Sequence, residues 1–250
     1  MIKKVFFKNI IFYNFNTKDL KKKIVEKKLF VFPSGYGLAS IDKNRQYLQS
    51  LKHADYVFFD SGFFVLLLRF IKNIKVNKFS GYKFLSLFFK FLRLNKKKSV
   101  YCIDPNINYS KSNMKYLKKI GVKKIYNYVA PKYNPKNLKD KRLIKEINKA
   151  KPDFIMTNIG GGTQEVLGLY LKKKIKFKTT ILCTGGAISF FTGDQAPINN
   201  FFDKFYLGWL VRLVFNPLVF YKRYIFALKL FPMVLFGKVE SKKWIKKYLK

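Results

Sequence analysis

The sequence contains few of the residues that build disulfide frameworks or metal centres. Among its 250 residues there are two cysteines and one histidine. Cys102 and Cys183 each lie inside an apolar run of strand length, which predicts two buried thiols and no disulfide. His53 and the 13 acidic residues show no metal-ligand spacing, so neither a metal centre nor a cofactor is expected.

Long apolar runs are also missing. No stretch contains the ~18 uncharged apolar residues that a membrane-spanning helix needs. The apolar run in residues 1–16 is broken by Lys8 and Asn9 and has no small-residue cleavage site, which argues against a signal peptide. The cytoplasm is therefore the expected compartment.

Acidic residues are scarce beside 52 basic ones, and the net charge is +39. A surface this basic attracts nucleic acid or anionic lipid headgroups. Only six of the basic residues are arginines, and lysine is abundant together with Phe, Ile, Asn and Tyr, a bias typical of AT-rich codons. Most lysines are therefore interpreted as solvated surface. Because no helix-turn-helix, zinc or aromatic-stacking signature is present, a basic nucleic-acid-binding protein is the least favoured function.

Apolar runs of strand length alternate with patterns of helical periodicity through most of the chain. Predicted strands cover residues 28–33, 56–59, 97–103, 122–128, 154–159 and 179–184. Predicted helices cover residues 42–52, 63–70, 112–120, 138–150 and 163–172. This alternation predicts an α/β fold with a mostly parallel, Rossmann-like sheet and helices on both faces. In such a sheet the ligand crevice lies beyond the carboxyl ends of the strands.

The composition changes near residue 196, which predicts an α/β core over residues 1–195 and a C-terminal helical segment over residues 196–250. Residues 201–236 are dense in aromatic and aliphatic side chains and are interrupted by lysines and arginines. One interpretation is a helical segment that lies in a membrane interface, with basic residues at headgroup level. The other is an ordinary helical cap packed on the sheet. The aromatic and basic composition favours a membrane-associating appendage.

Asp60 follows the apolar run 56–59 and precedes Ser61 and Gly62. A carboxylate at the mouth of a buried strand is partly desolvated, which suits a general base. Aspartate is equally suited to be the N-cap of a following helix. Both alternatives stay open for Asp60.

Two glycine-rich turns follow neighbouring predicted strands. Gly160–Gly161–Gly162 precedes a helix that opens with Gln164 and Glu165, and Gly185–Gly186 follows the strand at 179–184. Backbone N–H groups at a helix N-terminus can bind a phosphate, and a glutamine can both donate and accept a hydrogen bond. Flexible turns have the same composition, so each turn alone is weak support for a phosphate site. Together they predict one phosphate crevice.

Several blocks, collinear over about residues 30–230, resemble the WecG/TagA/CpsF family of glycosyltransferases (glycosyltransferase family 26). The blocks are His53–Ala54–Asp55 with Asp60–Ser61–Gly62, Lys78–Phe79–Ser80–Gly81, Lys151–Pro152–Asp153, Gly160–Gly161–Gly162–Thr163–Gln164–Glu165, Gly185–Gly186–Ala187, Leu207–Gly208–Trp209 and Tyr221–Lys222–Arg223–Tyr224. The chain departs from the family pattern at Phe32, Asn158, Leu167, Ser189 and Gly208. These departures motivate an alternative, a catalytically inactive nucleotide-sugar-binding protein on the same fold.

The resemblance implies an inverting, metal-independent glycosyltransferase. It would move a sugar, with an N-acetylmannosamine type as one option, from a UDP-sugar to a polyprenyl-diphosphate-linked glycan in cell-envelope or exopolysaccharide biosynthesis. The enzyme would work peripherally on the inner face of the cytoplasmic membrane, attracted by an anionic surface, and an oligomer is left open. Nucleic acid is not an expected specific partner.

The resemblance also assigns roles to residues. Asp60 would be the general base that deprotonates the acceptor hydroxyl. Arg212 and Arg223 of the C-terminal segment would approach the diphosphate and stabilise its charge in place of a metal. The other expected substrate-binding residues are Ser34, Ser61, Gly62, Lys78, Gly160, Gly161, Gln164, Glu165, Gly185 and Gly186.

Overall fold

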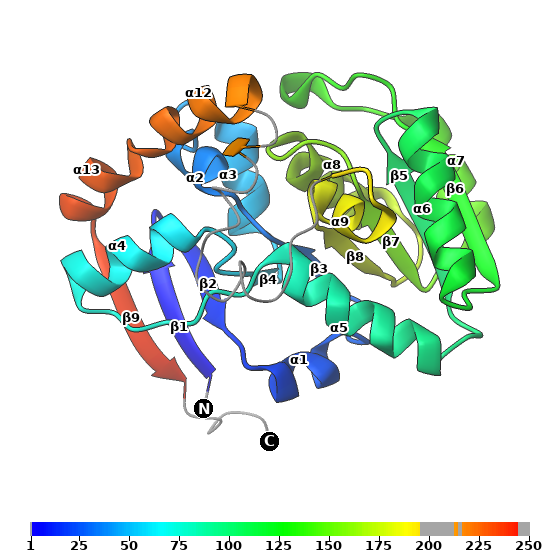
Figure 1. Ribbon diagram of the computed structural model, residues 1–250, viewed down its shortest axis with the longest axis horizontal. Helices are drawn as coiled ribbons and strands as arrows, with labels where there is room; N and C mark the ends of the chain where they lie inside the picture. Colours follow the sequence, from blue (N-terminus) through cyan, green and yellow to red (C-terminus); the bar gives the residue numbers. More distant parts are fainter. Residues whose placement is uncertain (1, 196–212, 215–216, 245–250) are drawn as a thin grey trace.

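A nine-stranded sheet forms the centre of the computed structural model, which describes residues 2–195, 213–214 and 217–244 (Figure 1). The strands are β1 (Ile2–Phe7), β2 (Ile10–Asn14), β3 (Leu29–Val31), β4 (Tyr56–Val57), β5 (Ser99–Asp104), β6 (Lys124–Val129), β7 (Phe154–Thr157), β8 (Thr180–Cys183) and β9 (Val239–Trp244). Their order across the sheet is β6-β5-β7-β8-β3-β4-β2-β1-β9. Every neighbouring pair is parallel except the two that involve β1, which confirms the predicted mostly parallel sheet.

The central strands β5, β7 and β8 are mostly apolar and are buried along their whole length, because helices cover both of their faces. Along β5, Tyr101 packs into one core cluster and Cys102 into the other, and along β7 Ile155 and Met156 divide in the same way. This is the residue pattern of parallel strands that are buried on both sides. Both cysteines are buried and free, as the sequence predicts.

Two layers of helices pack on the sheet, one on each face. One face carries α2 (Gly35–Ala39), α3 (Arg45–Lys52), α4 (Gly62–Lys72), α7 (Lys141–Ala150), α8 (Thr163–Lys174) and α13 (Leu230–Leu235). The other carries α1 (Thr17–Lys23), α5 (Gly81–Leu94), α6 (Ile107–Lys119), the 3-10 turn η2 (Gly185–Ile188) and α9 (Ser189–Thr192). A further short 3-10 turn, η1 (Pro135–Asn137), precedes α7. The predicted helices are present, whereas α5 was not assigned from the sequence.

Both ends of the described chain contribute strands to the same edge of the sheet. The first two strands form a hairpin whose turn residues, Lys8 and Asn9, have φ of 51° and 60°, the backbone geometry of a type I′ turn. β9 pairs antiparallel with β1 and closes this edge. The expectation of an entirely helical appendage is therefore wrong for residues 239–244.

The described C-terminal helices pack on the core. α12 (Pro217–Ala227) contacts α2, and α13 contacts α4 and α2. Leu230 and Val234 of α13 are fully buried among core residues of the first helical layer. A separate appendage is thus not confirmed for this part of the chain. Within the ranges that the structure describes, no helix combines the length and the apolar character needed to cross a bilayer.

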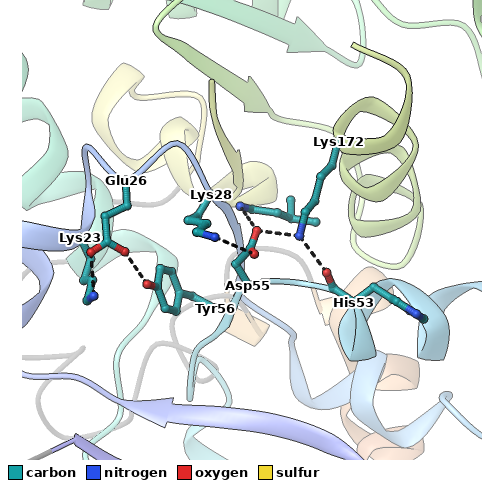
Figure 2. Close-up of polar contacts among 8 residues, drawn as sticks. Lys23, Glu26, Lys28, His53, Asp55, Tyr56 and Lys172 are labelled. Carbon is teal, nitrogen blue, oxygen red and sulfur yellow. Dashed lines mark hydrogen bonds and ion pairs between the residues drawn. The ribbon is translucent and has the colours of Figure 1, made fainter. Parts of the chain in front are cut away.

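The amino ends of the central strands are held together by the Asp55 carboxylate (Figure 2). Asp55 accepts a hydrogen bond from the Leu29 N–H at 2.8 Å and ion pairs from Lys172 at 2.7 Å and Lys28 at 3.6 Å. The Lys172 ammonium also donates to the His53 carbonyl at 3.2 Å. One carboxylate therefore joins β3, the start of β4 and α8.

Replacing Asp55 with asparagine should lower the free energy of unfolding by about 1–2 kcal/mol. The Asp55 side chain is only 17% exposed, so its bonds are worth more than those of a surface pair, although its exposed lysine partners reduce the effect. Asp42→Asn is a matched control because Asp42 pairs with Lys8 at the surface, and it should change stability by less than about 0.5 kcal/mol. Urea unfolding measures both values. Equal midpoints for Asp55→Asn and wild type would contradict this role.

Candidate active site

The candidate residues follow four strands that are adjacent in the sheet. β7, β8, β3 and β4 lie side by side and are parallel, so their carboxyl ends meet at one edge. Ser34 follows β3, Asp60 follows β4, the glycine loop 160–162 follows β7, and Gly185 follows β8. We call this region the carboxyl edge. It is where a parallel α/β sheet binds its ligands.

The Asp60 carboxylate is half-buried and is oriented by α5. Its Oδ1 accepts the N–H of Gly81, the first residue of α5, at 2.9 Å. The Phe79 N–H donates to the Phe59 carbonyl at 2.9 Å, which keeps the segment that contains Lys78 alongside Asp60. The N-terminus of a helix favours an anion at this position.

Ser61, and not Asp60, is the N-cap of α4. The Ser61 Oγ accepts the N–H of Phe64 at 3.2 Å, and Gly62 is the first residue of the helix. Ser34 caps α2 in the same manner, through the N–H of Gly37 at 3.2 Å. The capping role considered for Asp60 is therefore wrong for the helix that follows it, and the two serines have a structural role at the carboxyl edge.

The glycine loop after β7 is open on one side. A Cβ built on Gly160, Gly161 or Gly162 would meet nothing within 4 Å. Gly162 has φ of 89° and is the N-cap of α8. Its N–H donates to the Glu165 Oε2 at 2.7 Å, so this donor is already used within the protein.

The two glycine turns meet through Gln164. The Gln164 side chain is 3% exposed and its Nε2 donates to the Glu165 Oε1 at 3.0 Å. Gly185 has φ of 57°, and a Cβ built on it would lie 3.2 Å from the Gln164 Nε2. The neighbouring Gly186 adjoins the side chain of Gln195. The predicted proximity of the two turns is thus observed.

Burial is the main cause of the pKa shifts of Glu165 and Tyr47, which lie beneath these turns. Glu165 is 1% exposed, and burial raises its pKa to about 7, helped by the nearby Asp60 charge and opposed by the bonds from Gly162 and Gln164. Burial, followed by the charges of Glu165 and Asp60, raises the pKa of the Tyr47 phenol well above its usual range. Tyr47 belongs to the predicted helix at 42–52, and no local pattern in the sequence signals this polar neighbourhood.

A second buried polar group was missed at the ends of β5 and β7. The Asp104 Oδ1 accepts the side-chain amides of Asn113 and Asn158, each at 2.7 Å, and all three residues are almost fully buried. Burial raises the pKa of Asp104, while these hydrogen bonds oppose the shift. The contacts tie α6 and β5 to the segment that leads into the glycine loop. The signal in the sequence that could have revealed this group is Asp104, an acidic residue at the end of an apolar strand.

The C-terminal segment reaches the carboxyl edge through α12. A Cβ built on Gly35 would lie 2.9 Å from the Ser61 Oγ and 3.7 Å from the Ala227 Cβ. The loops after β3 and β4 are therefore close to the end of α12. The exposed Arg223 guanidinium lies 5.8 Å from the ring centroid of Tyr36, on α2. Arg212 lies outside the described residues.

At the amino ends of the strands, opposite the carboxyl edge, there is a hollow of about 370 Å³ around the Asp55 ion pairs. The acidic groups that line it are occupied, since Asp55 binds Lys28 and Lys172, and Glu26 binds Lys23 and the Tyr56 hydroxyl (Figure 2). We therefore assign this hollow a structural role. Over the described residues, no group of three or more His, Cys, Asp or Glu side chains could hold a metal ion.

A parallel α/β sheet with a half-buried carboxylate and two glycine turns at its carboxyl edge has the features of an α/β enzyme that binds its substrate there. The profile of the Glycosyl transferase WecG/TagA/CpsF family matches residues 9–244. The chain belongs to this family, as the sequence blocks predict, and is therefore a glycosyltransferase of cell-envelope polysaccharide biosynthesis. No curated protein was found to match the chain.

Gly185→Ala should lower the free energy of unfolding by about 1–2 kcal/mol, because alanine is disfavoured at positive φ. Its Cβ would also press on the Gln164 amide. Gly160→Ala is the matched control, since Gly160 has no positive φ and its Cβ would meet open space. Chemical denaturation of the two variants gives the comparison. A Gly185→Ala protein as stable as the Gly160→Ala protein would show that the tight turn is not required.

Proposed function

We propose that this glycosyltransferase moves a sugar, with inversion, from a UDP-sugar to a polyprenyl-diphosphate-linked glycan at a membrane surface. The observation that carries the proposal is the arrangement at the carboxyl edge. There Asp60 follows β4 and accepts the Gly81 N–H at 2.9 Å, while the two glycine turns follow β7 and β8 of the same parallel set of strands. A base and a diphosphate site at the same end of the strands are what a direct displacement at the anomeric carbon requires.

Asp60 is the general base in this mechanism. Its carboxylate takes the proton of the acceptor hydroxyl as that oxygen forms a bond to the anomeric carbon. The bond from this carbon to the diphosphate breaks at the same time, and UDP leaves with the electron pair. The Gly81 N–H holds one carboxylate oxygen at 2.9 Å, and this contact fixes the direction of the other oxygen.

The charge on the leaving diphosphate is met by backbone and basic groups. Gly160 and Gly161 border open space at the carboxyl edge, and Gly185 adjoins them through Gln164. Lys78 precedes α5 in the segment that runs beside Asp60. Arg223 reaches the same edge from α12. The family resemblance assigns Arg212 to the same task, and Arg212 lies outside the described residues. Arginine suits this task because its planar fork pairs with phosphate oxygens.

α12 is the part of the molecule that contacts the membrane. Its outward side carries Leu218, Tyr221 and Ile225, which are 89%, 60% and 49% exposed, and Leu228 continues the stripe at 58%. The spacing of three, four and three residues places these side chains on one side of a helix. Exposed Lys222 and Arg223 lie between them in the sequence. An apolar stripe with basic neighbours is typical of a helix that lies in a lipid interface.

Asp60→Asn should reduce the rate of sugar transfer by about 10²–10⁴-fold, the usual contribution of a general base. The amide oxygen can still accept the Gly81 N–H, so the fold and UDP affinity should be retained. Transfer is measured with a UDP-sugar and a polyprenyl-diphosphate-linked acceptor, and UDP affinity by calorimetry.

The donor is identified with a panel of UDP-sugars, which are ranked by how much each raises the thermal stability of the protein before transfer is measured.

The control for this substitution is Asp42→Asn, which removes one carboxylate far from the carboxyl edge and should leave transfer unchanged. Unaltered turnover in Asp60→Asn would remove Asp60 from the mechanism. A wild-type chain that binds UDP-sugars but releases no sugar with any acceptor would instead indicate a binding protein on this fold.

Replacing both Leu218 and Ile225 with glutamate should weaken binding to anionic vesicles by at least about tenfold, because each change removes an apolar side chain from the interface and adds repulsion. Both side chains are exposed, so folding should be unaffected. Vesicle sedimentation gives the partition coefficient. Leu94→Glu is the control, because Leu94 is 86% exposed and is the last residue of α5, a helix that lies away from α12 (Figure 1). Equal binding of the double variant and wild type would disprove a membrane role for α12.

A further inference from the structure

Glu165 cannot contact a substrate at the carboxyl edge directly, because its side chain is 1% exposed. Both of its oxygens are used inside the protein. Oε2 accepts the Gly162 N–H at 2.7 Å and Oε1 accepts the Gln164 Nε2 at 3.0 Å. An ionised carboxylate has only acceptors, so it fixes the Gln164 amide with its nitrogen toward Glu165.

Gln164 transmits this orientation to the second glycine turn. A Cβ built on Gly185 would lie 3.2 Å from the Nε2 and 3.4 Å from the Oε1 of Gln164, so the amide group adjoins the Gly185 backbone. The Gln164 backbone carbonyl also accepts a bond from the Cys183 thiol at 3.4 Å. A rotation of the Gln164 amide would therefore change the surface that Gly185 rests against.

We propose that Glu165 is a positioning residue, which holds Gly162 and Gln164 so that the two glycine turns form a single binding surface for the nucleotide diphosphate. The inference rests on the proposed function for the identity of that ligand. It replaces the direct substrate contact that the sequence predicted for Glu165, since the carboxylate acts through the loop and through Gln164.

The charge of Glu165 decides whether it can hold both partners. The titratable groups that face it are Tyr47 from α3, Asp60 after β4 and Cys183 of β8. Burial and the Asp60 charge raise the pKa of Glu165 to about 7. Above that pH the carboxylate accepts from both N–H groups. Below it, one oxygen carries a proton and accepts hydrogen bonds more weakly, so one of the two bonds is weakened.

Glu165→Gln reproduces the protonated state at every pH. A glutamine has one acceptor oxygen and one amino group, so it cannot accept from Gly162 and Gln164 on separate oxygens. UDP affinity should fall about tenfold or more in this variant, with KM for the donor raised and kcat nearly unchanged. In wild type, UDP affinity should decrease as the pH falls through about 7. In Glu165→Gln this decrease should be smaller, because only the terminal phosphate of UDP, with a second pKa of roughly 6, still takes up a proton.

Gln164→Ala and the double variant separate positioning from a general loss of structure. If Glu165 acts through Gln164, the double variant should bind UDP no worse than Gln164→Ala alone. Glu26→Gln is the matched control, since Glu26 is an acidic residue at the opposite edge of the sheet and should not affect UDP affinity. Wild-type affinity in Glu165→Gln, or fully additive losses in the double variant, would overturn the inference.

Hydrogen exchange tests the same inference without any ligand. Backbone amides of residues 161–165 should be less protected in Glu165→Gln than in wild type, because one anchor of the loop is gone. Unchanged protection would overturn the positioning role even in a protein that binds UDP. If wild type binds no UDP while the loop does lose protection in the variant, the proposed function fails and the structural role of Glu165 stands.

Discussion

The parallel pairing of β7, β8, β3 and β4 is the constraint on which the rest of the molecule depends. Backbone hydrogen bonds in this register leave polar groups at both ends of the strands, and the two ends are used differently. At the amino ends, Asp55 neutralises lysines and holds the chain together. At the carboxyl ends, serine caps and glycine turns follow the strands, and Asp60 is half-buried among them. The parallel register thus separates the structural charge of Asp55 from Asp60, the general base that we propose.

The parts of the fold that depend on local periodicity could be predicted from the sequence. The apolar runs at 56–59 and 154–159 and the amphipathic run at 138–150 became β4, β7 and α7 because their patterns match their final surroundings. The hairpin of β1 and β2 was missed because its turn residues, Lys8 and Asn9, include no glycine. β9 was missed because its partner β1 lies more than 200 residues away in the chain. β9 itself has the lysine-rich sequence of a solvated tail, and only pairing with β1 makes it a strand.

The positions of the site residues were more predictable than their partners. Asp60 and the glycine turns were found because polar or small residues follow apolar strands. Whether Asp60 caps α4 or faces α5 depends on the Gly81 backbone, which approaches only in the folded chain. The burial of Glu165 and the neighbourhood of Tyr47 likewise arise from packing between α8 and α3, which no local pattern encodes.

The pairing of β1 with β9 has a consequence for how the chain is synthesised and for how it can be shortened. During synthesis the hairpin of β1 and β2 emerges more than 200 residues before β9, and its outer edge stays open over that interval. The lysines on β1, Lys3 and Lys4, suit this interval, since charged side chains discourage an open edge from pairing with another molecule. Shortening the chain before β9 would leave that edge open permanently. The C-terminal helices are therefore better studied by substitution than by truncation.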